Sequence, residues 1–313
     1  MLSRRHIRIK VLQALYELGK DDSVDIVVGI RKLQRSIDRI YELFLFELQA
    51  LTDVHQIALE QIEQKRNRRL PSEEDLNPNL RFADNQFLCW LENNDKFKWG
   101  SDRFKINWGE EKDILIRIFK EFQESPEYQD YMSAEENTLA DDKKIVKIFY
   151  GKHIVHSEVF HQLYEEKELH WADDLDAAQM MVAKTLKSFD EKCDESTALP
   201  SLLKDTSDME FAKVLYRDCR QNDDKYAELI HAKTKNWEMD RIAQIDILLM
   251  KMALSELINF NQIPVKVSLN EYIEISKEYS TPKSGNFING ILDKLKIDLS
   301  ESGEIKKIGR GLL

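Results

Sequence analysis

The sequence predicts an all-helical protein, and three observations support this prediction. The 313 residues include only ten glycines and six prolines, so turns and chain breaks are few. The abundance of Leu, Ile, Glu and Lys favours helices over a sheet with many turns. Apolar residues also recur at spacings of three and four along most of the chain, which is the period of an amphipathic helix.

The first helix is predicted over residues 3–18, with Ser3 as its N-cap and Gly19 as its stop. One of its faces is apolar and carries Ile7, Val11, Leu15 and Leu18. Residues 1–20 hold five basic residues against one acidic residue, whereas residues 121–200 hold 19 acidic residues against eight lysines. That one segment accounts for the net charge of −11. The basic N-terminus can therefore meet phosphates while the acidic segment faces away from them.

The middle of the chain also has a helical pattern. Dense apolar positions within residues 21–69 predict one long helix or a pair of helices inside a bundle. Pro71 and Pro78 bracket a polar linker. Further helices are expected within residues 87–122, with one at 110–122, and over residues 141–167 and 173–189.

The last third of the chain has the clearest pattern. Helices are predicted over residues 208–220, 223–236, 240–259, 266–279 and 285–297. Pro264 and Pro282 each stand between two of these helices, where proline is tolerated and ends a helix. Residues 298–313 contain the basic residues Lys306, Lys307 and Arg310 and several glycines, and we expect them to form a flexible tail.

The most specific motifs in the sequence lie between residues 236 and 295. They read WEMDRI at 237–242, ILLMKMALSEL at 247–257, IPVKVSLNE at 263–271, ISKEYS at 275–280 and NFINGILDK at 286–294. In order and spacing these motifs resemble the C-terminal half of the NusB family of transcription antitermination proteins. RRHIR at 4–8 and QALY at 13–16 resemble the first helix of that family. Lys251, Ser255 and Lys283 depart from the family's usual Arg, Tyr and carboxylate, which affects the contacts and not the fold.

The resemblance implies a NusB-like helical bundle formed by residues 1–19 and 207–297, with residues 20–206 as a large helical insertion. It also implies a cytoplasmic factor for transcription antitermination and transcription regulation. Such a factor binds the single-stranded boxA element of nascent ribosomal RNA. It does so together with NusE, a small-subunit ribosomal protein, in the transcription elongation complex.

Seven residues match RNA-facing positions of the family: Arg4, Arg5, Arg8, Lys283, Asn286, Phe287 and Asn289. Guanidinium groups pair with phosphates, while a phenyl ring and amides recognise unpaired bases. The alternatives are a solvated basic helix start, a Phe287 packed in the core, and an Asn289–Gly290 pair that serves close helix packing. Asp246 matches an acidic position at the family's NusE interface, with a solvated helix carboxylate as the alternative.

The sequence lacks the signatures of several other functions. It has no phosphate-binding glycine loop and no recognisable nucleophile or triad, so we expect no enzyme, no cofactor and no small-molecule substrate. Of the two Glu-x-x-His pairs, about one is expected by chance, and partnering carboxylates at bundle spacing are not evident, so no metal is expected. No apolar run is long enough for a membrane span. A protein-binding helical scaffold that has the same fold without RNA affinity is the alternative function.

Residues 96–99 and 103–108 interleave basic and aromatic side chains. This composition suits a surface on which bases stack, and it equally suits a loop whose aromatics enter the core of the insertion. We favour the core.

Overall fold

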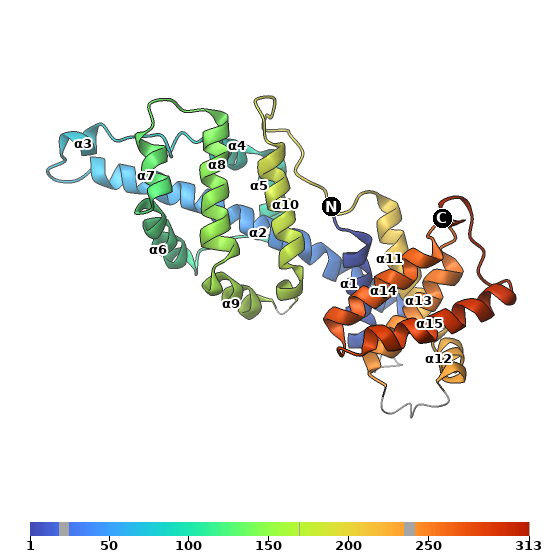
Figure 1. The fold of residues 1–313 in the computed structure, drawn as a ribbon. Helices are drawn as coiled ribbons and strands as arrows, with labels where there is room; N and C mark the ends of the chain where they lie inside the picture. The colour runs from blue at the N-terminus through green and yellow to red at the C-terminus, as the bar shows by residue number, and fades with distance from the viewer. Residues whose placement is uncertain (19–24, 169, 235–241, 313) are drawn as a thin grey trace. The chain divides into compact units, whose positions relative to one another are not determined.

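The computed structural model describes residues 1–18, 25–168, 170–234 and 242–312 (Figure 1). Within these ranges all regular secondary structure is helical and no strand occurs, which confirms the all-α prediction. None of the helices found there is both long and apolar enough to cross a membrane. The predicted stop at Gly19 and residues 237–241 of the WEMDRI motif lie outside the described residues.

The chain divides into two compact units. Unit 1 comprises residues 38–202 together with Met1, and unit 2 comprises residues 2–37 and 203–313. One border falls inside α2 (Ile26–Arg66), so this helix contributes residues to both units. The sequence predicts an insertion that spans residues 20–206. The start of α2 and residues 203–206 instead belong to unit 2.

Unit 1 contains most of α2, which is one long helix rather than a pair. All six residues from 43 to 48 are buried, and five of them belong to the hydrophobic core of this unit. A helix stretch that is buried all round must be covered by other elements. The other elements of unit 1 are α3 (Glu73–Leu76), α4 (Gln86–Asn93), α5 (Asp95–Phe104), α6 (Lys112–Gln123), α7 (Pro126–Ser133), α8 (Leu139–Phe149), η1 (Tyr150–Val155), α9 (Glu158–Lys167) and α10 (Trp171–Ser188).

Aromatic side chains fill much of the core of unit 1. The Trp108 ring stacks on Phe46 with ring centroids 4.2 Å apart, and its Nε1 donates to the Phe46 carbonyl at 2.9 Å. The prediction that the aromatics of residues 96–108 enter the core is confirmed for Phe97 and Trp108. It is wrong for Trp99, which is exposed.

The single helix predicted over residues 141–167 is interrupted. α8 passes into the π-helical turn η1, and α9 starts only at Glu158. Gly151 lies in the π-helical turn, and glycine is a weak helix former. Ser157 then takes an extended conformation, which ends the helical path before α9.

Unit 2 is a helical bundle that brings the two ends of the sequence together. Its helices beyond α2 are α1 (Arg4–Leu18), α11 (Thr206–Gln221), α12 (Asp223–Lys233), α13 (Gln244–Asn259), α14 (Val265–Tyr279), α15 (Ser284–Glu301) and the short η3 (Gly309–Leu312). Every residue of α13 from Leu249 to Leu257 is buried, so α13 is the central helix. α1 contacts α11, α13 and α14, which confirms the prediction that the first helix packs against the C-terminal helices.

The segment that we expected to be a flexible tail makes specific contacts. α15 continues to Glu301, and the Ile308 amide then donates to the Asn261 carbonyl at 3.0 Å. Lys307 Nζ donates to the Phe260 carbonyl at 2.9 Å. These acceptors lie at and just beyond the end of α13, where helix carbonyls lack partners within the helix. The tail therefore provides hydrogen-bond donors for backbone carbonyls at the C-terminal end of α13.

Glu47 is a completely buried carboxylic acid of unit 1. Glu47 of α2 accepts a hydrogen bond from the Tyr150 hydroxyl at 2.7 Å and from the Tyr164 hydroxyl at 3.4 Å. Burial disfavours the charged form and raises the pKa of Glu47 to about 8, although the hydrogen bonds lower it. Glu47 is therefore mostly protonated in the folded protein at neutral pH.

This burial predicts a pH dependence of stability. Between the ordinary pKa of 4.5 and the folded value of about 8, the folded chain keeps a proton that the unfolded chain has lost. Its contribution to the free energy of unfolding therefore falls as pH rises through this window. The variant Glu47→Gln cannot ionise. In urea unfolding we expect it to match the parent protein near pH 5 and to be more stable near pH 8.5. A difference that is constant with pH would contradict this assignment.

Candidate nucleic-acid interface

Arg8 of α1 and Glu256 of α13 form a buried ion pair in unit 2. The Arg8 Nε donates to Glu256 Oε2 at 2.8 Å and the Nη2 donates to Oε1 at 2.7 Å. Ser268 Oγ and the Tyr272 hydroxyl, both from α14, donate to the same carboxylate at 2.7 and 2.8 Å. Each carboxylate oxygen thus accepts two hydrogen bonds, and three helices meet at one charge.

This geometry corrects the prediction that Arg8 contacts RNA. Only 2% of Arg8 is exposed, and its guanidinium already pairs with Glu256. Burial alone would lower the pKa of Arg8, but the hydrogen bonds and the charge of Glu256 outweigh burial and raise it. A phosphate cannot replace Glu256 without exposing the core, so Arg8 is a structural residue.

Arg4 and Arg5 lie closer to solvent than Arg8. Arg5 makes a two-point ion pair with Glu271 of α14, with both distances 3.0 Å. The hydrogen bond from Arg5 lowers the pKa of Glu271, although burial raises it. The Arg4 Nε lies 3.4 Å from Asp208 of α11, and the guanidinium carbon lies 4.7 Å from the centre of the Phe211 ring. Each side chain is about 40% exposed, so a ligand can reach both.

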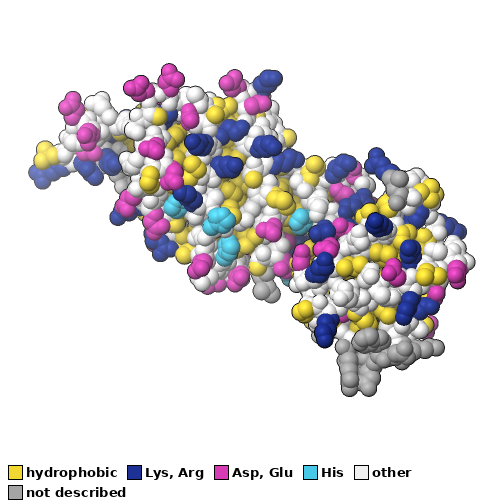
Figure 2. Space-filling model, in the orientation of Figure 1, with side chains coloured by type: hydrophobic (Ala, Val, Ile, Leu, Met, Phe, Trp, Pro, Cys, Tyr) yellow, Lys and Arg dark blue, Asp and Glu magenta, His cyan; other side chains and the backbone are white. Residues whose placement is uncertain are grey.

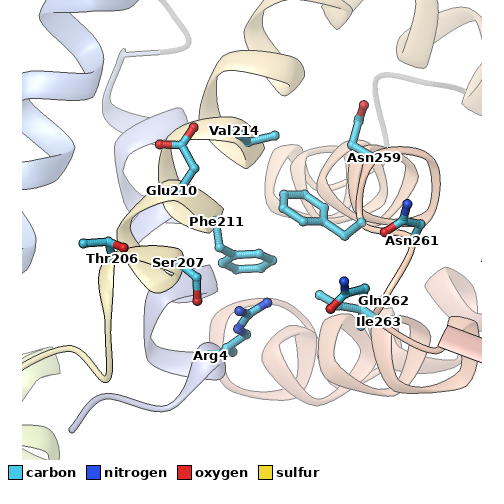
Figure 3. A pocket seen from close by; sticks show the side chains of 11 residues that line it. Arg4, Thr206, Ser207, Glu210, Phe211, Val214, Asn259, Asn261, Gln262 and Ile263 are labelled. Atoms are coloured by element: carbon cyan, nitrogen blue, oxygen red, sulfur yellow. The ribbon is translucent and has the colours of Figure 1, made fainter. Parts of the chain in front are cut away.

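Arg4 also borders a pocket of about 560 Å³ in unit 2 (Figure 3). In Figure 3 the Arg4 guanidinium lies beside the Phe211 ring, and the amides of Asn261 and Gln262 stand across from them. The remaining residues that line the pocket are Thr206, Ser207, Glu210, Val214, Asn259, Phe260 and Ile263. A cation, aromatic rings and several amides in one pocket can hold a planar polar group. The sequence motifs gave no signal for this pocket, because its residues come from three separate segments.

The start of α15 presents a polar surface. Lys283, Asn286 and Asn289 are exposed, while Phe287 is half-buried and makes contacts within the chain. Gly290 is also exposed, and an added Cβ would meet no described atom within 4 Å. The alternative that Asn289–Gly290 serves close helix packing is therefore wrong. Gly285 is the glycine next to α14, since its Cβ would lie 3.6–3.8 Å from Ile273, Ser276 and Lys277.

Asp246 does not lie on the surface. It is 4% exposed, and its two carboxylate oxygens accept hydrogen bonds from Ser280 Oγ at 2.6 Å and Ser284 Oγ at 2.7 Å. This corrects both the predicted contact with a partner protein and the alternative of a solvated carboxylate. Asp246 instead fixes the turn from α14 to α15 and so positions the exposed start of α15.

Charges of both signs cover the face of unit 2 in view. Figure 2 shows Lys and Arg side chains interspersed with Asp and Glu side chains over α14 and α15. No unbroken basic patch is visible there. Nucleic-acid binding on this face would therefore rest on a few specific contacts. Among the described residues, no group of three His, Cys, Asp or Glu side chains could hold a metal ion.

Comparisons with known proteins agree with this helical architecture. The model of the NusB family matches residues 173–296. A transcription antitermination protein NusB from Salinibacter ruber is 41% identical over 142 residues, which are 44% of this chain and 89% of that protein. NusB of Chloroherpeton thalassium is 49% identical over 78 residues, 25% of this chain and 37% of that protein. NusB of Natranaerobius thermophilus is 38% identical over 78 residues, 25% of this chain and 56% of that protein.

No solved structure matches the chain. The sequence matches define a class of all-helical proteins that are named for transcription antitermination. This chain belongs to the NusB family.

The buried ion pair predicts unequal roles for the arginines of α1. Arg8→Ala leaves the Glu256 charge in the core without its partner, which costs about 3–5 kcal/mol of unfolding free energy. Arg5→Ala removes a partly exposed pair and should cost less than about 1 kcal/mol. Urea unfolding monitored by circular dichroism measures both values.

A double variant is the control for this prediction. Arg8→Met combined with Glu256→Gln removes both charges and should recover much of the stability lost in Arg8→Ala. Equal losses for Arg8→Ala and Arg5→Ala would show that the pair is not a structural centre.

Proposed function

We propose that this protein is a cytoplasmic transcription antitermination factor that binds the boxA element of nascent ribosomal RNA together with NusE. Membership of the NusB family is the observation that carries the proposal. The alignment with the Salinibacter ruber NusB spans 44% of this chain and 89% of that protein. The proposed activity is binding within the elongation complex, without catalysis.

The proposed RNA contacts are those predicted residues that solvent reaches. Arg4 and Lys283 provide charges for phosphates, and Asn286 and Asn289 provide amides for the edges of unpaired bases. Lys283 replaces a carboxylate that is common in the family. It therefore attracts RNA phosphates at a position where a carboxylate would repel them. The bare backbone at Gly290 allows a nucleotide to approach α15 closely.

Three other predicted residues enter the proposal in a modified form. Arg5 must exchange Glu271 for a phosphate, so its contribution to affinity is reduced by the lost ion pair. The half-buried Phe287 offers only part of its ring for stacking. Asp246 acts through the turn that it holds, so its effect on any partner protein is indirect.

The commitment of Arg5 and Arg8 to internal carboxylates favours one alternative function. A helical scaffold that binds proteins and not RNA needs no free arginines on α1. The following measurement distinguishes the two functions.

Binding of a boxA-bearing RNA oligonucleotide is measured over a series of salt concentrations, with and without NusE. Affinity should fall as salt rises, because phosphate contacts release counterions. The variant Arg4→Ala/Lys283→Ala should bind more weakly. Its slope of log affinity against log salt should be smaller by up to about 1.4, since each phosphate contact on a single strand contributes about 0.7.

Lys296→Ala is the matched control, because Lys296 is exposed on the opposite face of α15 from Lys283. It should leave the slope unchanged. No RNA binding by the parent protein under any condition would support the scaffold. An unchanged slope in the double variant would remove Arg4 and Lys283 from the RNA site.

A further inference from the structure

Unit 1 exposes one tryptophan although its other large aromatics are mostly buried. Trp99 of α5 is 60% exposed, whereas Trp108 is 1% exposed. Lys96, Trp99 and Arg103 recur at spacings of three and four, so they share one face of α5. An exposed tryptophan that is flanked by cations on one helix face suits contact with a partner.

Arg103 holds the aromatic side chains of this face together. Its guanidinium carbon lies 5.2 Å from the centre of the Trp99 ring and 5.3 Å from the centre of the Phe104 ring. Both distances are those of cation–π contacts. The Phe104 ring lies 6.5 Å from Tyr41 of α2. The cation and three rings thus form one continuous surface.

This surface lines a pocket of about 350 Å³. Its walls are the rings of Tyr41, Trp99 and Phe104 and the residues Ala198, Leu199, Ser201 and Leu202, with Asp38, Lys96 and Arg103 as the charged groups. The mostly apolar walls and the Asp38 carboxylate disfavour a phosphate inside the pocket. An uncharged planar ring fits there, with negative groups outside beside Lys96 and Arg103.

The charge around the pocket also points to a polyanion. Residues 96–105 hold four basic residues and one acidic residue. The segment from 121 to 200 in the same unit holds 19 acidic residues against eight lysines. Residues 96–105 are therefore basic although the unit is acidic overall, and basic residues beside an aromatic platform fit single-stranded nucleic acid.

We propose that the pocket beside Trp99 binds one unpaired base of single-stranded RNA, while the adjoining phosphates lie on Lys96 and Arg103. The choice of RNA over an acidic peptide with an apolar anchor rests on the proposed function. Every residue of the site belongs to unit 1, and its aromatic and basic side chains precede the residues that the family model matches, so it provides a second RNA contact. Each contact can be removed without the other.

The test uses the full chain carrying Arg4→Ala/Lys283→Ala, so that the proposed contacts in unit 2 are weakened. The probes are a mixed-sequence RNA decamer and inorganic polyphosphate of similar charge. Trp99→Ala should weaken RNA binding about tenfold, as expected for the loss of one stacked base. Trp99→Phe should retain most of the affinity, and RNA should quench tryptophan fluorescence in the parent and not in Trp99→Phe.

Lys96→Ala and Lys98→Ala form a matched pair, because both side chains are exposed on α5 and only Lys96 lines the pocket. Lys96→Ala should weaken RNA binding severalfold, while Lys98→Ala should change it less than twofold. Unchanged thermal unfolding of all variants verifies folding, since the substituted side chains are exposed.

Three results would overturn the base pocket. One is equal RNA affinity of Trp99→Ala and its parent, and another is quenching by polyphosphate to the same extent as by RNA. The third is quenching by an acidic peptide with an aromatic anchor in the absence of any effect of RNA. None of these results depends on whether Arg4 and Lys283 bind boxA RNA. That contact is tested separately, by the Arg4→Ala/Lys283→Ala variant in a chain that keeps Trp99.

Discussion

The architecture of unit 2 depends on the ion pair between Arg8 and Glu256. A carboxylate in the interior is costly unless its oxygens are fully hydrogen-bonded, and Glu256 reaches that state only with donors from α1 and α14. α13 therefore needs the first helix of the chain as a partner, although Arg8 lies 248 positions before Glu256. The remainder of α1, including its apolar stripe, is positioned by the same contact.

This constraint divides the arginines of α1 by role. Arg4 and Arg8 lie one helical turn apart and both face the Phe211 ring, at 4.7 and 5.3 Å from its centre. Arg8 lies on the inner side, with its charge used by Glu256, while Arg4 borders the pocket and remains partly exposed. Asp246 has a comparable structural role at the other end of α13, where it fixes the turn before α15. The exposed Arg4 and the exposed start of α15 are thus positioned by the buried groups Arg8, Glu256 and Asp246.

The sequence allowed the fold to be predicted well, because helical periodicity and proline positions report directly on local structure. Burial of individual charges was not predictable in the same way. Arg4 and Arg8 look alike in sequence, and only the fold shows that Glu256 lies beside Arg8. The single acid within the apolar ALSEL motif was the available signal. Trp99 and Trp108 likewise lie in segments of similar basic and aromatic composition. Their opposite exposures follow from tertiary packing around α2.

Native-state hydrogen exchange of the α1 amides tests the central role of the ion pair most directly. If Arg8 and Glu256 join α1 to α13, the amides of residues 8–15 open only with those of α13 and α14. Their opening free energies should then equal those of the α13 and α14 amides. Exchange of α1 through a smaller opening, while α13 and α14 stay protected, would contradict the account, because α1 would then be a separable addition to the bundle.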